Sequence, residues 1–166
     1  KKTLTDPTKQ YKPWDLVWYR IVVSNKGNMP MGTFKVNDYL PQWVQYVSSS
    51  PAWQYYASNH VVYRTLVWWL PAYGQKVLFL TGKILSEWTH MNCVELGSYT
   101  GLSSWLSPHD IDSDPDNMDI GALEDDESCV EVTATNPVNP AVCKSLAVTP
   151  TSWTNPLALS YFCDAT

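Results

Sequence analysis

The stretch from Tyr19 to Ser50 constrains the fold of this chain more than any other, because apolar and polar residues alternate along it. In residues 16–24 one face collects Val17, Tyr19, Ile21 and Val23. A period of two is typical of a strand with one buried side. The segment Asn25-Lys26-Gly27-Asn28 follows, and its residue types accept the positive φ that a chain reversal needs. A Leu40–Pro41 corner then separates two further short strands.

Similar β-branched and aromatic runs continue along the chain, and turn residues separate them. No segment keeps helical periodicity for three turns, and the prolines fall between the runs, as strand ladders require. The expected strands cover residues 16–24, 33–38, 44–49, 60–67, 76–85, 89–96 and 129–135. This spacing predicts an all-β fold, an Ig-like β-sandwich.

The character of the sequence changes after the sixth of these strands. Residues 99–127 are rich in Gly, Ser, Pro and Asp, and they predict a long acidic loop. We therefore expect a first domain over 1–136, a short linker over 137–142 that includes Pro140, and the beginning of a second β unit over 143–166. Two strands cannot bury a core alone. The partial unit is thus either cut off or completed by strands from elsewhere.

Composition narrows the classes of partner. The net charge is −5, and the 11 basic residues form no stripe, so nucleic acid is not an expected partner. No apolar run is long enough to span a bilayer, and no signal segment stands at the start. The abrupt start and end suggest an excerpt of a longer, processed protein.

The four cysteines fit neither a zinc nor a redox motif, because no two lie close together in sequence. An even number in a β chain of this composition favours two disulfides and an oxidising compartment. Three pairings are possible, and buried free thiols are the alternative. An antiparallel pair of strands turning at Trp153 would bring together Cys143 and Cys163, which leaves Cys93 with Cys129.

Several motifs together resemble those of the bacterial cell-surface "conserved repeat" domain. They are residues 15–21 (DLVWYRI), 24–28 (SNKGN), 36–41 (VNDYLP), 70–74 with Leu70-Pro71 and Gly74, and 91–94 (MNCV). The acidic segment 110–117 with 124–126 is similar to an insertion in some of these repeats. Residues 143–150, 155–157 and Cys163 resemble the opening of a polycystic-kidney-disease-type (PKD) Ig-like domain. The resemblance implies tandem Ig-like modules of exported proteins with no assigned activity.

The chain has nine Trp and only seven Gly, which inverts the usual balance. Several tryptophans occupy turn positions where the family pattern suggests Gly. In Lys12-Pro13-Trp14-Asp15 the third position of a type II turn needs positive φ, which Gly supplies. We hypothesise that UGA codons read as Gly underlie some of these positions. The candidates are Trp14, Trp43, Trp88 and Trp153, with Trp53, Trp68 and Trp105 as further positions of the same kind.

Alternating aspartates in the acidic loop are spaced like the oxygen ligands of a calcium site. The candidate ligands are Asp110, Asp112, Asp114, Asp116 and Asp119, with Glu124, Asp125 and Asp126 as possible additions. The pattern is not an EF-hand, because Pro115 and Asn117 stand where the turn glycine belongs. The alternative is a solvated acidic loop with no bound ion.

The sequence shows no residue set typical of a catalytic triad. His60, His90 and His109 lie far apart, and no Gly-x-Ser-x-Gly elbow is present. The first two are expected to be structural, whereas His109 adjoins the acidic loop. A covalent bond from Asn92 to Lys9, Lys12 or Lys35 beside a carboxylate is a further option, against ordinary surface lysines.

These features predict a non-catalytic, self-associating structural module of an extracellular bacterial fibre, stalk or surface layer. Its expected partners are neighbouring copies or adjacent repeats, joined head to tail or by strand pairing. An adhesin or carbohydrate-binding module is the alternative, in which exposed rings stack on sugars. The candidate platform is Trp53, Tyr55, Tyr56, Trp68, Trp69 and Tyr73.

Overall fold

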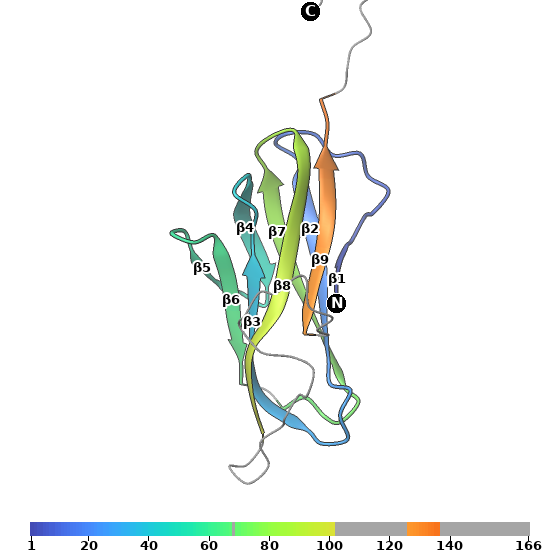
Figure 1. The fold of residues 1–166 in the computed structure, drawn as a ribbon, viewed down its shortest axis with the longest axis vertical. Coiled ribbons are helices and arrows are strands. Elements are labelled where there is room, and N and C mark those ends of the chain that lie inside the picture. The colour runs from blue at the N-terminus through green and yellow to red at the C-terminus, as the bar shows by residue number, and fades with distance from the viewer. Residues whose placement is uncertain (68, 102–125, 137–166) are drawn as a thin grey trace, which may run out of the picture. The chain divides into compact units, whose positions relative to one another are not determined.

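The computed structural model describes residues 1–67, 69–101 and 126–136, and within these ranges the chain is built of strands and turns (Figure 1). The described strands are β1 (Lys2–Leu4), β2 (Leu16–Ser24), β3 (Met31–Tyr39), β4 (Val44–Ser50), β5 (Gln54–Tyr56), β6 (Val61–Leu66), β7 (Gln75–Ile84), β8 (Trp88–Gly101) and β9 (Glu127–Ala134).

The strands form two antiparallel sheets that face each other as a sandwich (Figure 1). One sheet has four strands in the order β1-β2-β7-β4, and the other has five in the order β5-β6-β3-β8-β9. The described residues contain no helix. The expected all-β sandwich is therefore confirmed, and each of the seven expected strands has an observed counterpart.

The core lies between the sheets, and the alternation in β2 places its residues there. Val17, Tyr19 and Ile21 are at most 1% exposed, whereas the intervening Leu16, Trp18 and Arg20 face outward. Phe34 and Val36 of β3 supply the facing side of the core, together with other buried apolar residues of both sheets. Burial of this kind contributes about 1.5–3 kcal/mol for each large apolar side chain.

Two strands were missing from the sequence prediction, and the turn expected after β2 leads to a strand of the other sheet. β1 and β5 are three residues long, too short to show a period of two. β2 does not pair with β3, although a short turn joins them in sequence. β2 pairs with β1 and β7, whereas β3 pairs with β6 and β8, so the connection crosses from one sheet to the other.

The crossing loop also obtains its shape differently from the expectation. No residue of Asn25–Asn28 has positive φ. Instead the Asn25 side chain holds the loop: its Nδ2 donates to the carbonyls of Met29 at 2.8 Å and Pro71 at 3.1 Å, and its Oδ1 accepts from the Gly27 N–H at 3.0 Å. A side chain that bonds nearby main-chain groups replaces the positive-φ turn.

Positive φ instead occurs at residues other than glycine. Trp14 has φ 76° and Trp88 has φ 114°, and their side chains are 65% and 75% exposed. Asp15 N–H donates to the Lys12 carbonyl at 3.1 Å, which closes the turn that the sequence predicted, with Trp14 at its third position. Bulky residues at positive φ are strained, and glycine is the residue that such positions favour.

The other candidate tryptophans differ from these two. Trp43 is 51% exposed, but its φ is not positive, so its turn makes no demand for glycine. Trp53 is 7% exposed and belongs to the core, which a glycine would leave with a cavity. Trp68, Trp105 and Trp153 lie outside the described residues.

Replacement of Trp14 or Trp88 by glycine is expected to stabilise the fold. Each change removes positive-φ strain of about 1–3 kcal/mol at the cost of little buried area, so we expect a gain of about 1–2 kcal/mol in the free energy of unfolding. Urea denaturation of each variant measures it. Trp43→Gly is the matched control, and a loss of stability in all three variants would contradict the strain argument.

Residues up to Asn136 form one compact unit. β8 continues through Gly101 and β9 begins at Glu127, so both ends of the expected acidic loop are strand instead. The rest of that loop, the linker and the partial second unit lie outside the described residues.

Candidate functional site

Three polar side chains lie buried between the sheets: Lys2 of β1, Asp38 of β3 and Asn92 of β8. They are 3%, 0% and 0% exposed. Asp38 is opposite Val94, and Asn92 lies two residues from Val94 on the same strand. Asp38 and Asn92 are therefore diagonal neighbours on one face of the five-stranded sheet.

Lys2 approaches this pair from the other sheet. It pairs with Ile21, whose side chain is buried, so the lysine also points into the sandwich. Its Nζ forms an ion pair and hydrogen bond with Asp38 Oδ2 and lies 4.6 Å from the centre of the Tyr19 ring. The Lys2 main-chain N–H donates to Ser128 Oγ at 2.9 Å, which ties β1 to β9.

Burial dominates the electrostatics of this cluster. It lowers the pKa of the Lys2 ammonium to about 8, although the Asp38 carboxylate opposes the shift. Burial likewise raises the pKa of Asp38, against the favourable charge of Lys2. The pKa of the Tyr19 hydroxyl is raised by burial as well. Both partners of the ion pair are thus shifted toward their neutral forms.

The cluster contains polar atoms without partners. Among the described residues, neither Nδ2 nor Oδ1 of Asn92 has a hydrogen bond, and the same holds for Asp38 Oδ1 and Tyr19 Oη. The Asn92 amide is nevertheless near enough to act on the pKa of Asp38 and Tyr19. It therefore lies beside both groups without a hydrogen-bonding geometry to either.

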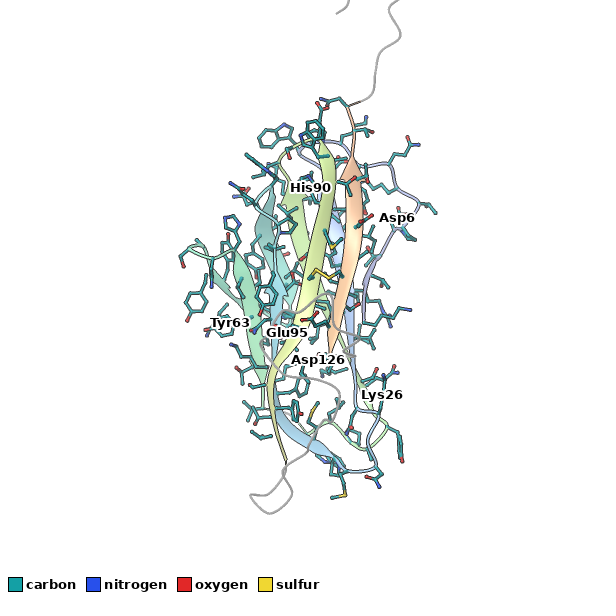
Figure 2. All side chains as sticks on the ribbon, viewed as in Figure 1. Asp6, Lys26, Tyr63, His90, Glu95 and Asp126 are labelled. Atoms are coloured by element: carbon teal, nitrogen blue, oxygen red, sulfur yellow. A yellow bond between two sulfur atoms is a disulfide. The ribbon has the colours of Figure 1, made fainter. Side chains whose placement is uncertain are left out.

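A disulfide joins the two strands at the edge of the five-stranded sheet. Cys93 of β8 and Cys129 of β9 are directly opposite in register, with Cα atoms 4.0 Å apart (Figure 2). It is one of the two bridges expected from the sequence. Cys143 and Cys163 lie outside the described residues.

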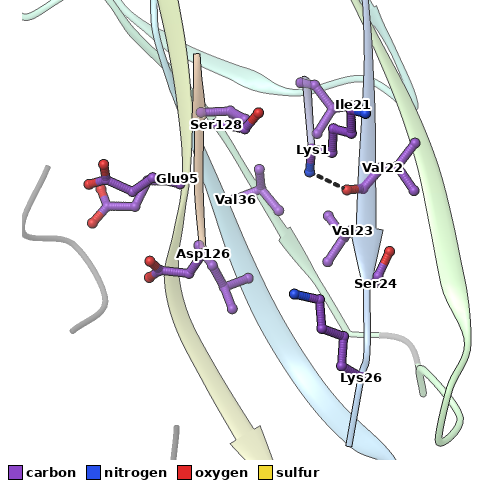
Figure 3. A pocket seen from close by; sticks show the side chains of 13 residues that line it. Lys1, Ile21, Val22, Val23, Ser24, Lys26, Val36, Glu95, Asp126 and Ser128 are labelled. Atoms are coloured by element: carbon purple, nitrogen blue, oxygen red, sulfur yellow. Dashed lines mark hydrogen bonds between the residues drawn. The ribbon is translucent and has the colours of Figure 1, made fainter. Parts of the chain in front are cut away.

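An open groove of about 480 Å³ runs along the edge of the sandwich, between β2 and β9. Its lining includes residues of both charges, and Figure 3 shows Lys1 and Lys26 on the side of β2, with Glu95 and Asp126 on the other. Its floor is apolar and includes Ile21, Val36 and Val94. Among the described residues that line the groove, none is a His or a Cys.

The other predicted site residues have separate locations. The five calcium candidates Asp110, Asp112, Asp114, Asp116 and Asp119 lie outside the described residues, as does His109; in the part of the chain that the structure covers, no cluster of metal ligands occurs. His90 is buried with its Nε2 3.3 Å from the Ser86 carbonyl, and His60 is half-buried with its ring edge-on to Tyr55.

The proposed lysine partners of Asn92 were wrong. Lys9 forms an ion pair with Asp15, Lys12 is exposed, and Lys35 lies over the Tyr63 ring. Sequence reasoning missed Lys2 because a three-residue strand gives no periodicity. One feature of the sequence could have pointed to this cluster. Asn92 lies two residues before Val94 in an expected strand, so both side chains face the core.

The aromatic residues do not form one exposed platform within the described ranges. Trp53 is in the core, and half-buried Tyr55 stacks on Tyr46 at 5.3 Å. Exposed Tyr56 stacks on Tyr63 at one end of β6, whereas Trp69 and Tyr73 follow its other end. The expected sugar-binding arrangement is therefore not present in these residues.

Comparison with known proteins gives distant structural matches. No family model and no curated protein matches the chain. The CARDB domain of the PF1109 protein from Pyrococcus furiosus, solved with di-metal ions, is 13% identical with a TM-score of 0.45, covering 81% of this chain and 84% of that one. A collagen-binding domain from a Staphylococcus aureus adhesin is 10% identical with a TM-score of 0.42, covering 61% and 85%.

Across the described residues, we find no helix with the length and apolarity needed to cross a membrane.

Proposed function

We propose that this chain is a structural, self-associating repeat module of an extracellular bacterial fibre, stalk or surface layer, and that it performs no catalysis. The observation that carries the proposal is the edge of β2 beside the groove. Lys1 and Val22 exchange main-chain hydrogen bonds of 2.7 and 2.8 Å, and the groove with its apolar floor lies beside this ladder.

The geometry of that edge suits an added strand. In an antiparallel ladder the next residue whose main-chain groups face the same side is Ser24, which is exposed. A strand from a neighbouring module or another copy that added at this edge would cover the apolar floor of the groove, the head-to-tail pairing that builds filaments.

Two interactions inside the sandwich support a structural role, because they fix strands to one another. The Lys2–Asp38 pair bridges the two sheets, and the disulfide fastens the last two described strands. The disulfide also supports an oxidising, extracellular location. We further propose the predicted division into a domain over 1–136, a linker over 137–142 and a second unit over 143–166, with calcium stiffening the acidic loop between β8 and β9.

Sedimentation velocity and electron microscopy of the full chain test this function. Self-association into filaments is expected, more strongly with calcium than with a chelator. Ser24→Pro removes the main-chain donor at the open edge and should abolish assembly, whereas Ser24→Ala should keep it. A monomer under all conditions, or equal assembly of both variants, would contradict strand pairing at this edge.

A further inference from the structure

If its only role is packing, the cluster of Lys2, Asp38 and Asn92 lowers the stability of the fold relative to an apolar core. A buried polar group without a hydrogen bond costs about 1–3 kcal/mol, and apolar residues can often replace a buried ion pair without loss. Here four polar atoms around one point lack partners within the described structure: both amide atoms of Asn92, Asp38 Oδ1 and Tyr19 Oη. A lysine amine, a carboxyl group and a carboxamide therefore meet in an interior closed to water.

We propose that Lys2 and Asn92 form an intramolecular amide cross-link, promoted by Asp38. The Lys2 Nζ attacks Asn92 Cγ, a new C–N bond forms, and the bond from Cγ to Nδ2 breaks. One proton from the amine leaves with the amide nitrogen, so ammonia is released. The atoms balance without an oxidant, a cofactor or any other reactant.

Each side chain has a defined task in this reaction. The amine must be neutral to attack, and burial favours this form because it lowers the pKa of Lys2 to about 8. Burial also raises the pKa of Asp38, so its carboxyl group can hold the proton of the Lys2–Asp38 pair. The protonated acid can donate to Asn92 Oδ1, which makes Cγ more electrophilic, and it can then return a proton to the departing nitrogen.

The fold accelerates the cross-linking reaction further, because the strands hold the reacting side chains close together. Lys2 is held by the ladder to β2 and by Ser128, whereas Asp38 and Asn92 stand diagonally on the facing sheet. Holding an amine and an amide on either side of one carboxyl group replaces an encounter in solution, and such proximity can correspond to effective concentrations of about 10⁵–10⁸ M. Exclusion of water also prevents hydrolysis of the amide. The free amide atoms of Asn92 leave its carbonyl accessible to the acid.

The position of the cross-link has a mechanical consequence, which depends on the function proposed above. Asn92 adjoins Cys93, which is already bonded to Cys129. With both bonds present, tension that enters at Lys1 passes through Lys2 to Asn92 and through Cys93 to Cys129. Residues 3–91 and 94–128 then carry none of it.

Intact-mass spectrometry of the folded, reduced full chain tests the cross-link independently of assembly. The loss of ammonia should lower the mass by about 17 Da, and digestion should yield a branched peptide that joins Lys2 to the segment containing Asn92. Lys2→Arg and Asn92→Ala should each retain the full mass expected from their sequence. Lys9→Arg, the control, should still lose ammonia. Full mass in the folded wild-type chain, or a branch at another lysine, would overturn the proposal.

Asp38→Asn tests whether Asp38 promotes the cross-linking reaction or only fills space in the core. The change keeps the size of the side chain and removes the acid. We expect the cross-linked fraction to fall at least tenfold while far-UV circular dichroism still shows the β fold. A cross-linked fraction equal to the wild type would overturn the role of Asp38.

Discussion

Asp38→Ala is expected to lower the free energy of unfolding by at least about 3–5 kcal/mol, because without Asp38 the cross-link does not form and the Lys2 ammonium stays in the interior without a counter-ion. Lys2 and Asp38 both have fully buried side chains, so solvent does not screen their interaction. Urea denaturation at neutral pH, followed by tryptophan fluorescence, measures the change. The loss is comparable with the whole stability of many domains of this size.

The chain provides a matched control for that variant. Asp15 pairs with Lys9 at 3.5 Å, but these side chains are 33% and 30% exposed. Exposed pairs contribute between about zero and 1 kcal/mol, so Asp15→Ala should have a small effect. Equal losses for Asp38→Ala and Asp15→Ala would show that the buried pair does not hold the sheets together.

A double replacement distinguishes an ion pair from a covalent bond. If Lys2 and Asp38 form only a buried pair, Lys2→Met with Asp38→Leu should be nearly neutral, since both charges leave together. If the cross-link is present, the double variant also loses the restriction on its unfolded chain. For a loop of this length the loss amounts to about 4–5 kcal/mol in the chain-entropy model. A neutral outcome would therefore argue against the covalent bond.

The sequence was sufficient to predict most of the strands, for a simple physical reason. A strand with one buried face shows a period of two over its own residues, as in Val17, Tyr19 and Ile21 of β2. The turn at Trp14 was equally readable, because the demand for positive φ is local. β1 and β5 carried no such signal, since three residues cannot establish a period.

The pairing of strands and the buried cluster depended on contacts far apart in sequence. Asn25 and its neighbours suggested a turn with positive φ, but hydrogen bonds from the Asn25 side chain to Met29 and Pro71 support a crossing between sheets instead. Lys2 and Asp38 are 36 residues apart, and nothing local marks them as partners. The only local indication of the buried cluster was that Asn92 occupies a core-facing position of its expected strand.

Tension applied to single molecules tests the central claim, a covalently closed module that resists extension. The full chain is held at its two ends, and each variant is compared with the wild type. With the cross-link and the disulfide intact, the domain over 1–136 should extend by no more than about 30 Å, because only the few residues after Cys129 can be straightened. Before Cys129 the tension passes through the cross-link and the disulfide, which cannot be extended.

Two variants set the scale of that measurement. Lys2→Arg should release residues 3–91 in a step of about 300 Å, and the double variant Cys93→Ser with Cys129→Ser should release residues 94–128, about 120 Å. The account predicts no large step for the oxidised wild-type domain at forces that unfold Lys2→Arg. A step of about 300 Å in the oxidised wild type would contradict it.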